Sequence, residues 1–218
     1  MVTSSPTAPT TTTLDFESIY AAAGGDPARI PWARERPHPA LVSWLNAIAP
    51  SLIRCGSRVA VVGCGLGHDA QEILRRGYDV TAFDCSETAI DWARRLDPVH
   101  ADAYHVADLL HAPSRWRHRF DLVVEVNTLQ SLPSDQRQDA MHAVTDLLSP
   151  HGRLLVICRG AEEPPALEDG PPWPLAEDEL ATLASVAGLE DDGGISIFED
   201  GETPPVLRMR ALFQRARG

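Results

Sequence analysis

Three glycines alternate with other residues directly after a β-branched apolar run, in the segment VAVVGCGLGHDA from Val59 to Ala70. The chain becomes polar and helix-forming immediately after Gly63, Gly65 and Gly67. A buried strand that turns through glycines into a helix lets a ligand approach the backbone closely. The segment therefore predicts an α/β fold with a ligand site at the carboxyl end of this strand.

Strand-like and helix-like patterns alternate along the rest of the chain. The runs LVVEV and RLLVIC are almost continuously apolar, as expected of strands buried on both faces of a parallel sheet. This alternation predicts a doubly wound, seven-stranded, mostly parallel α/β sheet whose last strand pair is antiparallel. We expect strands at 58–63, 79–84, 103–107, 120–126, 152–159, 194–198 and 206–213, and helices at 68–76, 87–95, 134–148 and 175–187.

The two ends of this pattern differ in composition from its centre. Residues 1–13 are rich in Ser, Thr and Pro and are predicted to form a disordered lead. Residues 14–218 are predicted to form one domain. Its first part carries short helices near 15–23 and 41–48, and residues 161–174 form a loop because prolines exclude regular structure there.

Composition limits the class of ligand. The net charge of −12 argues against nucleic acid as a partner, because phosphate backbones need a basic face. The sequence shows no membrane-length apolar run and no signal peptide. The four cysteines form no C-x-x-C pair, which favours reduced thiols in the cytoplasm. A small-molecule ligand is therefore expected, with a monomer and a dimer both left open.

The glycine spacing and two aspartates indicate what that ligand is. No Gly-Lys-Ser/Thr follows the glycines, and His68 stands where a dinucleotide-binding loop has its third glycine. Asp84 ends the strand VTAFD, where a carboxylate can accept hydrogen bonds from ribose hydroxyls. Asp108 follows the third strand and is placed to reach an adenine edge. A ribose and an adenine without a phosphate predict S-adenosyl-L-methionine as the cofactor.

From about Ile30 to the C-terminus the sequence resembles the class I S-adenosylmethionine-dependent methyltransferases. The similar motifs are GCGLGHDA, VTAFDCS, VADLL and FDLVVEVNTLQSLP. The resemblance implies that the three glycines surround the methionine and ribose parts of the cofactor and that Asp84 holds the ribose. It implies further cofactor contacts at Asp108 and Leu109 for the adenine, and at Glu125 and Val126 on the pocket floor. Cys64 and Cys85 fall at the ends of adjacent strands, where they either line this site or are small packed residues.

Two proline- and tryptophan-rich segments resemble the thiopurine- and thiol-methyltransferase-like branch of that family. PWARERPHPALVSWL is similar to its N-terminal lid, which here would span residues 14–50, with Trp32 closing over the cofactor. DGPPWPLAEDEL is similar to its cover loop. Both segments could instead be packed proline-rich loops.

Methyl transfer depends mainly on alignment and desolvation, so no catalytic residue is obligatory. A soft thiolate needs no strong base, whereas a hydroxyl or amine acceptor can need one. The catalytic residue is therefore unknown, with Tyr20, His38 and Arg159 as weak candidates, each also open to a structural role. Trp173 would give the acceptor an aromatic wall or simply pack. The histidine spacings match no metal motif, and we expect no metal.

These observations predict an enzyme that methylates a small molecule, with a thiol or a thiopurine-like heterocycle as the first choice of acceptor. The alternatives are an O- or N-methyltransferase of a small natural product and a non-catalytic S-adenosylmethionine-binding protein. A nicotinamide-dependent oxidoreductase is disfavoured by His68.

Overall fold

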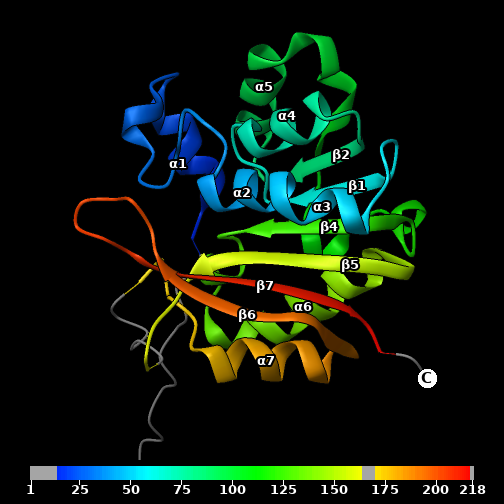
Figure 1. Ribbon diagram of the computed structural model, residues 1–218. Coiled ribbons are helices and arrows are strands. Elements are labelled where there is room, and N and C mark those ends of the chain that lie inside the picture. The colour runs from blue at the N-terminus through cyan, green and yellow to red at the C-terminus, as the bar shows by residue number, and fades with distance from the viewer. Residues whose placement is uncertain (1–13, 164–169, 217–218) are drawn as a thin grey trace, which may run out of the picture.

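A seven-stranded sheet organises the computed structural model, which describes residues 14–163 and 170–216 (Figure 1). Its strand order is β3-β2-β1-β4-β5-β7-β6. The neighbours among β1 to β5 pair in parallel, and β7 is antiparallel to both β5 and β6. The predicted fold class is therefore confirmed. The strands are β1 (Arg58–Val62), β2 (Asp79–Asp84), β3 (Tyr104–Val106), β4 (Phe120–Val126), β5 (Leu148–Arg159), β6 (Leu189–Glu199) and β7 (Leu207–Arg215).

Helices cover both faces of this sheet, which makes a three-layer arrangement (Figure 1). One apolar cluster joins α2, α4 and α5 to one face, and the other joins α6 and α7 to the opposite face. The helices are α1 (Phe16–Ala23), α2 (Pro39–Ala47), α3 (Ala49–Leu52), α4 (His68–Arg75), α5 (Glu87–Leu96), α6 (Ser134–Leu147) and α7 (Glu177–Val186).

The central strands are apolar because both of their faces are covered. Val59, Val61, Leu122 and Val124 pack in the cluster with α2 and α4, whereas Val123 belongs to the cluster with α6. Alternate residues of one strand thus enter opposite layers. The near-continuous apolar runs of the sequence follow from this double coverage.

The strand order reverses between β1 and β4, which are direct neighbours in the sheet although β2 and β3 lie between them in the sequence. Crossovers from these two strands leave in opposite directions, so a crevice opens beyond their carboxyl ends. The glycine turn follows β1 at this edge. The fold therefore places the predicted ligand segment at the topological switch point.

The predicted starts of β5, α7 and β6 are wrong, each because of a tertiary contact. Strand β5 begins at Leu148 rather than 152, since Leu148 pairs with Phe120 across an irregularity in the register. Helix α7 begins at Glu177 rather than 175, since the Leu175 amide donates to the Arg159 carbonyl at 3.1 Å. Strand β6 begins at Leu189 rather than 194, since pairing with β7 continues through an irregularity between Asp191 and Ile195 that absorbs two glycines.

The predicted disordered lead, residues 1–13, lies outside the described residues, as do residues 164–169 of the predicted loop. Within the part of the chain that the structure describes, no helix is both long enough and apolar enough to cross a membrane.

Candidate functional site

The three glycines of the turn after β1 all have positive φ angles, of 57°, 51° and 84° in chain order. Two of them are required by protein packing. A Cβ at Gly63 would lie 2.5 Å from the hydroxyl of Thr128, and a Cβ at Gly67 would lie 2.8 Å from the ring of Tyr104 and 3.0 Å from Ala93. Gly63 thus lets the turn approach β4, and Gly67 lets the start of α4 pack against β3 and α5.

Gly65 differs from its two neighbours because it faces the N-terminal segment. A Cβ there would lie 2.9 Å from the Tyr20 hydroxyl, and no other atom of the described residues beyond its chain neighbours lies within 4 Å. The Gly65 amide donates a hydrogen bond of 2.9 Å to Oδ2 of Asp84. Of the three predicted glycines, Gly65 is therefore the one that joins the turn, the end of β2 and the N-terminal cover.

Asp84 fastens the glycine turn to the end of β2. Its Oδ2 accepts the Gly65 amide, and its Oδ1 accepts the Ser86 amide at 3.0 Å. Burial raises the pKa of this carboxyl, and the backbone hydrogen bonds oppose that shift. The thiol and the amide of Cys85 also hydrogen-bond to this carboxyl, so Asp84 gathers the glycine turn and the first residues after β2.

An aromatic group covers the turn. The indole nitrogen of Trp32 donates to the Tyr20 hydroxyl at 3.0 Å, and the rings of Phe16 and Trp32 meet edge-on with centroids 5.7 Å apart. Tyr20 is buried, and burial followed by the charge of Asp84 raises its pKa, so its phenol stays protonated at neutral pH. Tyr20 is therefore placed as a packing and hydrogen-bonding group of the cover, not as a base.

Helix α1 is held against the start of α5 by one carboxylate. Glu17 accepts hydrogen bonds from the Ser86 hydroxyl at 2.7 Å and from the Thr88 amide at 3.1 Å, and the Thr88 hydroxyl also donates to it. The hydrogen bond from Ser86, followed by those from the hydroxyl and the amide of Thr88, holds the pKa of Glu17 below its usual value. Glu17 was not foreseen, because its partners lie about seventy positions away in the sequence.

The residues predicted for the adenine lie beyond β3. Asp108 is exposed and caps a short 3-10 turn, where its carboxylate accepts the Leu110 amide at 3.0 Å and contacts Nδ1 of His111 at 2.6 Å. Leu109 is half-buried beside it, and Cys85 is exposed after β2. The exposed carboxylate of Asp108 thus forms a polar patch with His111 just beyond the end of β3.

Glu125 lies in the interior and not on an open pocket floor. Its side chain is fully buried, and Oε1 accepts the amides of Thr128 and Leu129, the latter at 2.9 Å. Oε2 has no hydrogen-bond partner among the described residues. Burial raises the pKa of Glu125 to about 7. The carboxyl therefore supports the turn after β4, and the half-buried Val126 next to it is closer to the surface.

Neither cysteine near the glycine turn is an activated thiol. Cys64 lies within the turn, where burial and the charge of Asp84 raise its pKa well above the usual range. Its Sγ lies 3.9 Å from the Gly65 carbonyl oxygen. A thiol in such a place stays protonated and acts as a small packed group.

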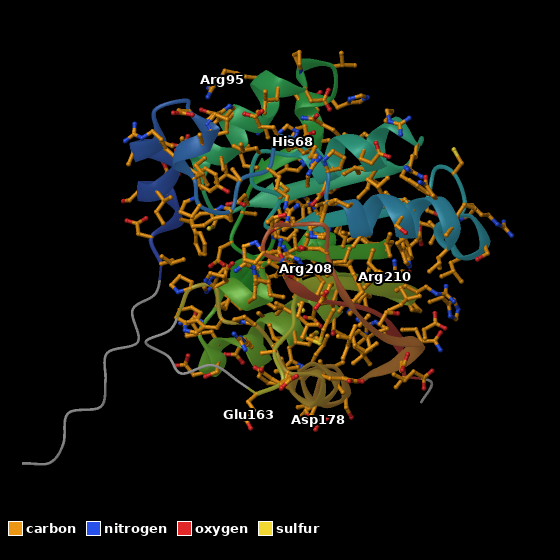
Figure 2. All side chains as sticks on the ribbon, turned by 60° about the vertical axis from the view of Figure 1, so that its left-hand side comes forward. His68, Arg95, Glu163, Asp178, Arg208 and Arg210 are labelled. Atoms are coloured by element: carbon orange, nitrogen blue, oxygen red, sulfur yellow. The ribbon has the colours of Figure 1, made fainter. Side chains whose placement is uncertain are left out.

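A charged cluster that the sequence did not reveal lies at the carboxyl ends of β4 and β5. Arg208 on β7 is buried, and its guanidinium donates to Asp200 at 2.7 Å, to Glu202 at 3.2 Å and to the Asn127 side chain at 3.3 Å. Glu202 also pairs with Arg34, so the loop after β6 is tied to the N-terminal segment. Figure 2 labels Arg208 and Arg210, which lie two residues apart on β7.

The three catalytic candidates occupy different surroundings. Arg159 is half-buried opposite Arg208 in the β5–β7 register, and its amide donates to the Gln130 side chain at 2.5 Å. His38 caps α2 with Nδ1, and burial followed by the charges of Arg34 and Arg208 lowers its pKa to about 3. A ring that binds a proton so weakly is a poor general base, which favours the capping role of His38 over a catalytic one.

Trp173 packs into the protein, with its amide donating to the Gln130 carbonyl at 2.7 Å and its carbonyl accepting from buried Arg137 at 2.7 Å. It is 6% exposed, which favours the packing interpretation over an open aromatic wall.

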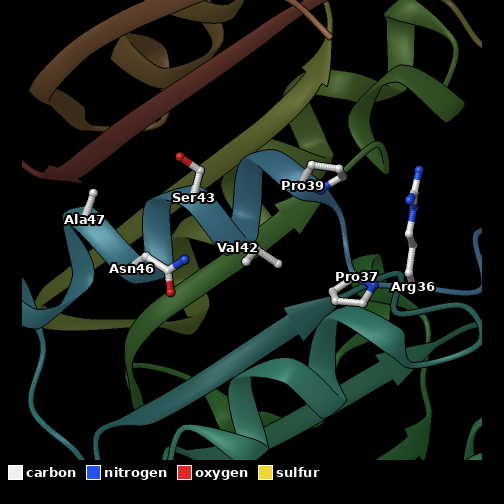
Figure 3. A pocket seen from close by; sticks show the side chains of 7 residues that line it. All are labelled: Arg36, Pro37, Pro39, Val42, Ser43, Asn46 and Ala47. Atoms are coloured by element: carbon white, nitrogen blue, oxygen red, sulfur yellow. The ribbon is translucent and has the colours of Figure 1, made fainter. Parts of the chain in front are cut away.

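A shallow, mostly apolar groove with a volume of about 600 Å³ runs along the outer side of α2 (Figure 3). None of the predicted site residues lines it. The lining residues are Arg36, Pro37, Pro39, Val42, Ser43, Asn46 and Ala47. Among the residues that the structure describes, no group of three or more His, Cys, Asp or Glu side chains is arranged to hold a metal ion.

Similarity to known proteins agrees with this geometry. Residues 59–152, from β1 into β5, match the sequence model of a family described as a methyltransferase domain. A ubiquinone biosynthesis O-methyltransferase from Alkalilimnicola ehrlichii is 32% identical over 102 residues, which cover 46% of this chain and 40% of that protein. A tRNA N(3)-cytidine methyltransferase from Bos taurus is 27% identical over 159 residues, covering 61% of this chain and 42% of that protein. The chain thus matches less than half the length of these curated relatives.

A solved structure extends the likeness to almost the whole fold. The 1,6-didemethyltoxoflavin-N1-methyltransferase of Burkholderia thailandensis, described with 1,6-didemethyltoxoflavin and S-adenosylhomocysteine bound, superposes with a TM-score of 0.69 at 19% identity. The superposition covers 96% of this chain and 95% of that one. The two proteins share the same overall fold.

Proposed function

We propose that this chain is a class I S-adenosylmethionine-dependent methyltransferase that binds its cofactor over the carboxyl ends of β1 to β3 and methylates a small molecule. The observation that carries the proposal is the Asp84–Gly65 junction at the switch point. One buried carboxylate fastens the glycine turn at the end of β2. That arrangement fits the two hydroxyls of a ribose and offers nothing cationic for a phosphate.

S-adenosylmethionine would supply an electrophilic methyl group whose bond to sulfur breaks as the acceptor lone pair forms the new bond, releasing S-adenosylhomocysteine and a proton from the acceptor. The chain's own residues would orient the two reactants. Asp84 would hold the ribose, and Asp108 with Leu109 would contact the adenine. Gly65 would permit the close backbone approach. Tyr20 and Trp32 would cover the site and exclude water, since alignment near van der Waals contact supplies most of the acceleration.

The acceptor that we place first is a thiol or a thiopurine-like heterocycle, with a phenol or an amine second. Two features support a small acceptor. The cover above the turn is aromatic, and the net charge of −12 opposes a polyphosphate partner. Because the chain is also similar to a tRNA methyltransferase, the test below includes tRNA as an acceptor. We also propose that the enzyme is cytoplasmic and that residues 14–50 act as its lid.

The test is a calorimetric titration with S-adenosylhomocysteine, followed by a screen of S-adenosylmethionine consumption with thiols, phenols, amines and tRNA. We expect binding of S-adenosylhomocysteine, no competing affinity for NAD, and turnover of a small acceptor that falls in Trp32→Ala. Tight NAD binding without S-adenosylhomocysteine binding would refute the cofactor assignment. Methylation of tRNA alone would refute the small acceptor, and cofactor binding without any turnover would indicate a binding protein.

A further inference from the structure

His38 leaves one buried ring nitrogen without a partner. The side chain is 2% exposed, and its Nδ1 accepts the Ala40 amide at 3.2 Å as the cap of α2. Its Nε2 is buried and has no hydrogen-bond partner among the described residues. An unsatisfied buried polar atom costs on the order of 1–3 kcal/mol. A bound molecule that supplied the missing partner would recover part of that cost.

The bond at Nδ1 determines what Nε2 can do. A ring nitrogen that accepts an amide hydrogen carries no proton, so the neutral ring has its proton on Nε2. The positive charges of Arg34 and Arg208 and the burial of the ring keep it neutral. Nε2–H is therefore a hydrogen-bond donor that has no acceptor among the described residues.

The surroundings of His38 are also rich in donors. The hydrogen bonds of Arg208 to Asp200, Glu202 and Asn127 use three of its five N–H groups. Arg34 approaches from the N-terminal segment through its ion pair with Glu202. The carboxylates of Asp200 and Glu202 neutralise part of this charge, yet the two arginines outweigh Asp200 in their effect on His38.

The position of this cluster separates it from the cofactor residues. Asn127 follows β4, and Arg208 lies opposite Arg159 at the end of β5. The proposed ribose contact, Asp84, ends β2, and the proposed adenine contacts follow β3. His38 lies between this cluster and the glycine turn, since its amide donates to Asp69 in the first turn of α4 at 2.7 Å. The cluster thus lies on the side of the switch point that the adenosine would leave free.

We propose that the methyl acceptor carries a carboxylate, and that this group accepts the Nε2–H of His38 beside Arg34 and Arg208. The inference rests on the proposed methyltransferase function and assigns its substrate class. The methylated atom is a separate nucleophile of the same molecule, and the carboxylate serves to hold it in position. His38 is a binding residue in this account and takes up no proton.

Two substitutions separate the two nitrogens of the ring. In His38→Asn the side-chain oxygen can still cap α2, as asparagine commonly does, while the donor at the Nε2 position is lost. In His38→Gln an amide N–H can reach that position, while the cap is weakened. The probes are three pairs of compounds, each with and without a carboxylate: 2-mercaptobenzoate and thiophenol, 2-hydroxybenzoate and phenol, and 2-aminobenzoate and aniline.

We expect methyl transfer to at least one acid, with a lower KM than for its neutral partner. His38→Asn should raise the KM for the acid about ten- to hundredfold, as for the loss of one hydrogen bond to a charged group, and should leave the neutral partner unchanged. His38→Gln should retain most of the preference although its melting temperature falls. S-adenosylhomocysteine should bind both variants as it binds the unaltered protein.

Several results would overturn the inference. They are turnover of neutral compounds only, turnover of none of the acids by a protein that binds S-adenosylhomocysteine, or an unchanged preference in His38→Asn. Weaker binding of S-adenosylhomocysteine to His38→Asn would assign Nε2 to the cofactor instead. If the unaltered protein does not bind S-adenosylhomocysteine, the proposed function itself fails.

Discussion

The fully buried Glu125 should make the stability of the protein depend on pH in a way that Glu125→Gln removes. Burial raises the folded-state pKa of this carboxyl from 4.5 to about 7, and Oε2 has no partner among the described residues. Because the folded state holds the proton more tightly than the unfolded state does, the free energy of unfolding falls as pH rises between these two pKa values. Above about pH 7 the loss is complete.

The magnitude follows from the size of the shift. The difference between about 7 and 4.5 is about 2.5 pKa units, and each unit corresponds to about 1.4 kcal/mol, so the full loss is about 3 kcal/mol. About 2 kcal/mol of it falls between about pH 5.5 and about pH 8. Starting at about pH 5.5 keeps the protein above its isoelectric point near 5.0.

The assay is urea unfolding of both proteins at these two pH values. The glutamine oxygen can still accept the amides of Thr128 and Leu129, and the side chain cannot ionise. We expect the stability of Glu125→Gln relative to the unaltered protein to rise by about 2 kcal/mol between the two pH values. Whatever the new amide costs inside the core is the same at both pH values and cancels from this difference.

The matched control is Glu199→Gln, at an exposed position of β6. The free energy of unfolding of Glu199→Gln should change between the two pH values by the same amount as that of the unaltered protein. If the free energy of unfolding of Glu125→Gln also changes by that same amount, Glu125 is not protonated in the folded protein and the reasoning from burial is refuted.

Three further predictions concern the cofactor side of the site. Gly67→Ala should lower the free energy of unfolding in urea by about 1–3 kcal/mol, because its Cβ would meet Tyr104. The control Gly188→Ala, at a similar positive φ with nothing within 4 Å, should lower it by less, and equal losses would exclude the Tyr104 contact as the cause. Asp84→Asn should weaken S-adenosylhomocysteine binding by about 1.5–3 kcal/mol in calorimetry, since an amide can accept only one of its two backbone N–H groups; unchanged affinity would remove Asp84 from the site. Glu17→Gln should speed S-adenosylhomocysteine dissociation in stopped-flow measurements by loosening α1 from α5, and an unchanged rate would mean that α1 does not cover the cofactor.

The order of the sheet could be predicted because the signals that determine it are local. Apolar runs such as Phe120–Val126 identify buried strands whatever they pack against, and right-handed crossovers then leave few possible topologies. The positive φ angles at Gly63, Gly65 and Gly67 are also predictable from local sequence, since glycine is the residue that adopts them without strain. The placement of Asp84 at the switch point followed from its position at the end of a strand.

The roles of individual side chains depended on partners distant in the sequence. The sequence could not show which side chain faces each glycine of the turn, whereas the structure places Tyr20 opposite Gly65 and Thr128 opposite Gly63. Glu125 looked like a pocket residue until the turn after β4 enclosed it.

The same holds for His38 and the cluster around Arg208. His38 looked like a base because its amino-acid type permits that chemistry, yet the amide of Ala40 and the charge of Arg208 decide which nitrogen holds the proton. Arg208 carried no signal at all, since its surroundings exist only after β7 pairs antiparallel to β5 and brings the loop after β6 to the N-terminal segment. Protonation and hydrogen-bond direction depend on atoms a few ångströms away, and only the tertiary structure brings those atoms together.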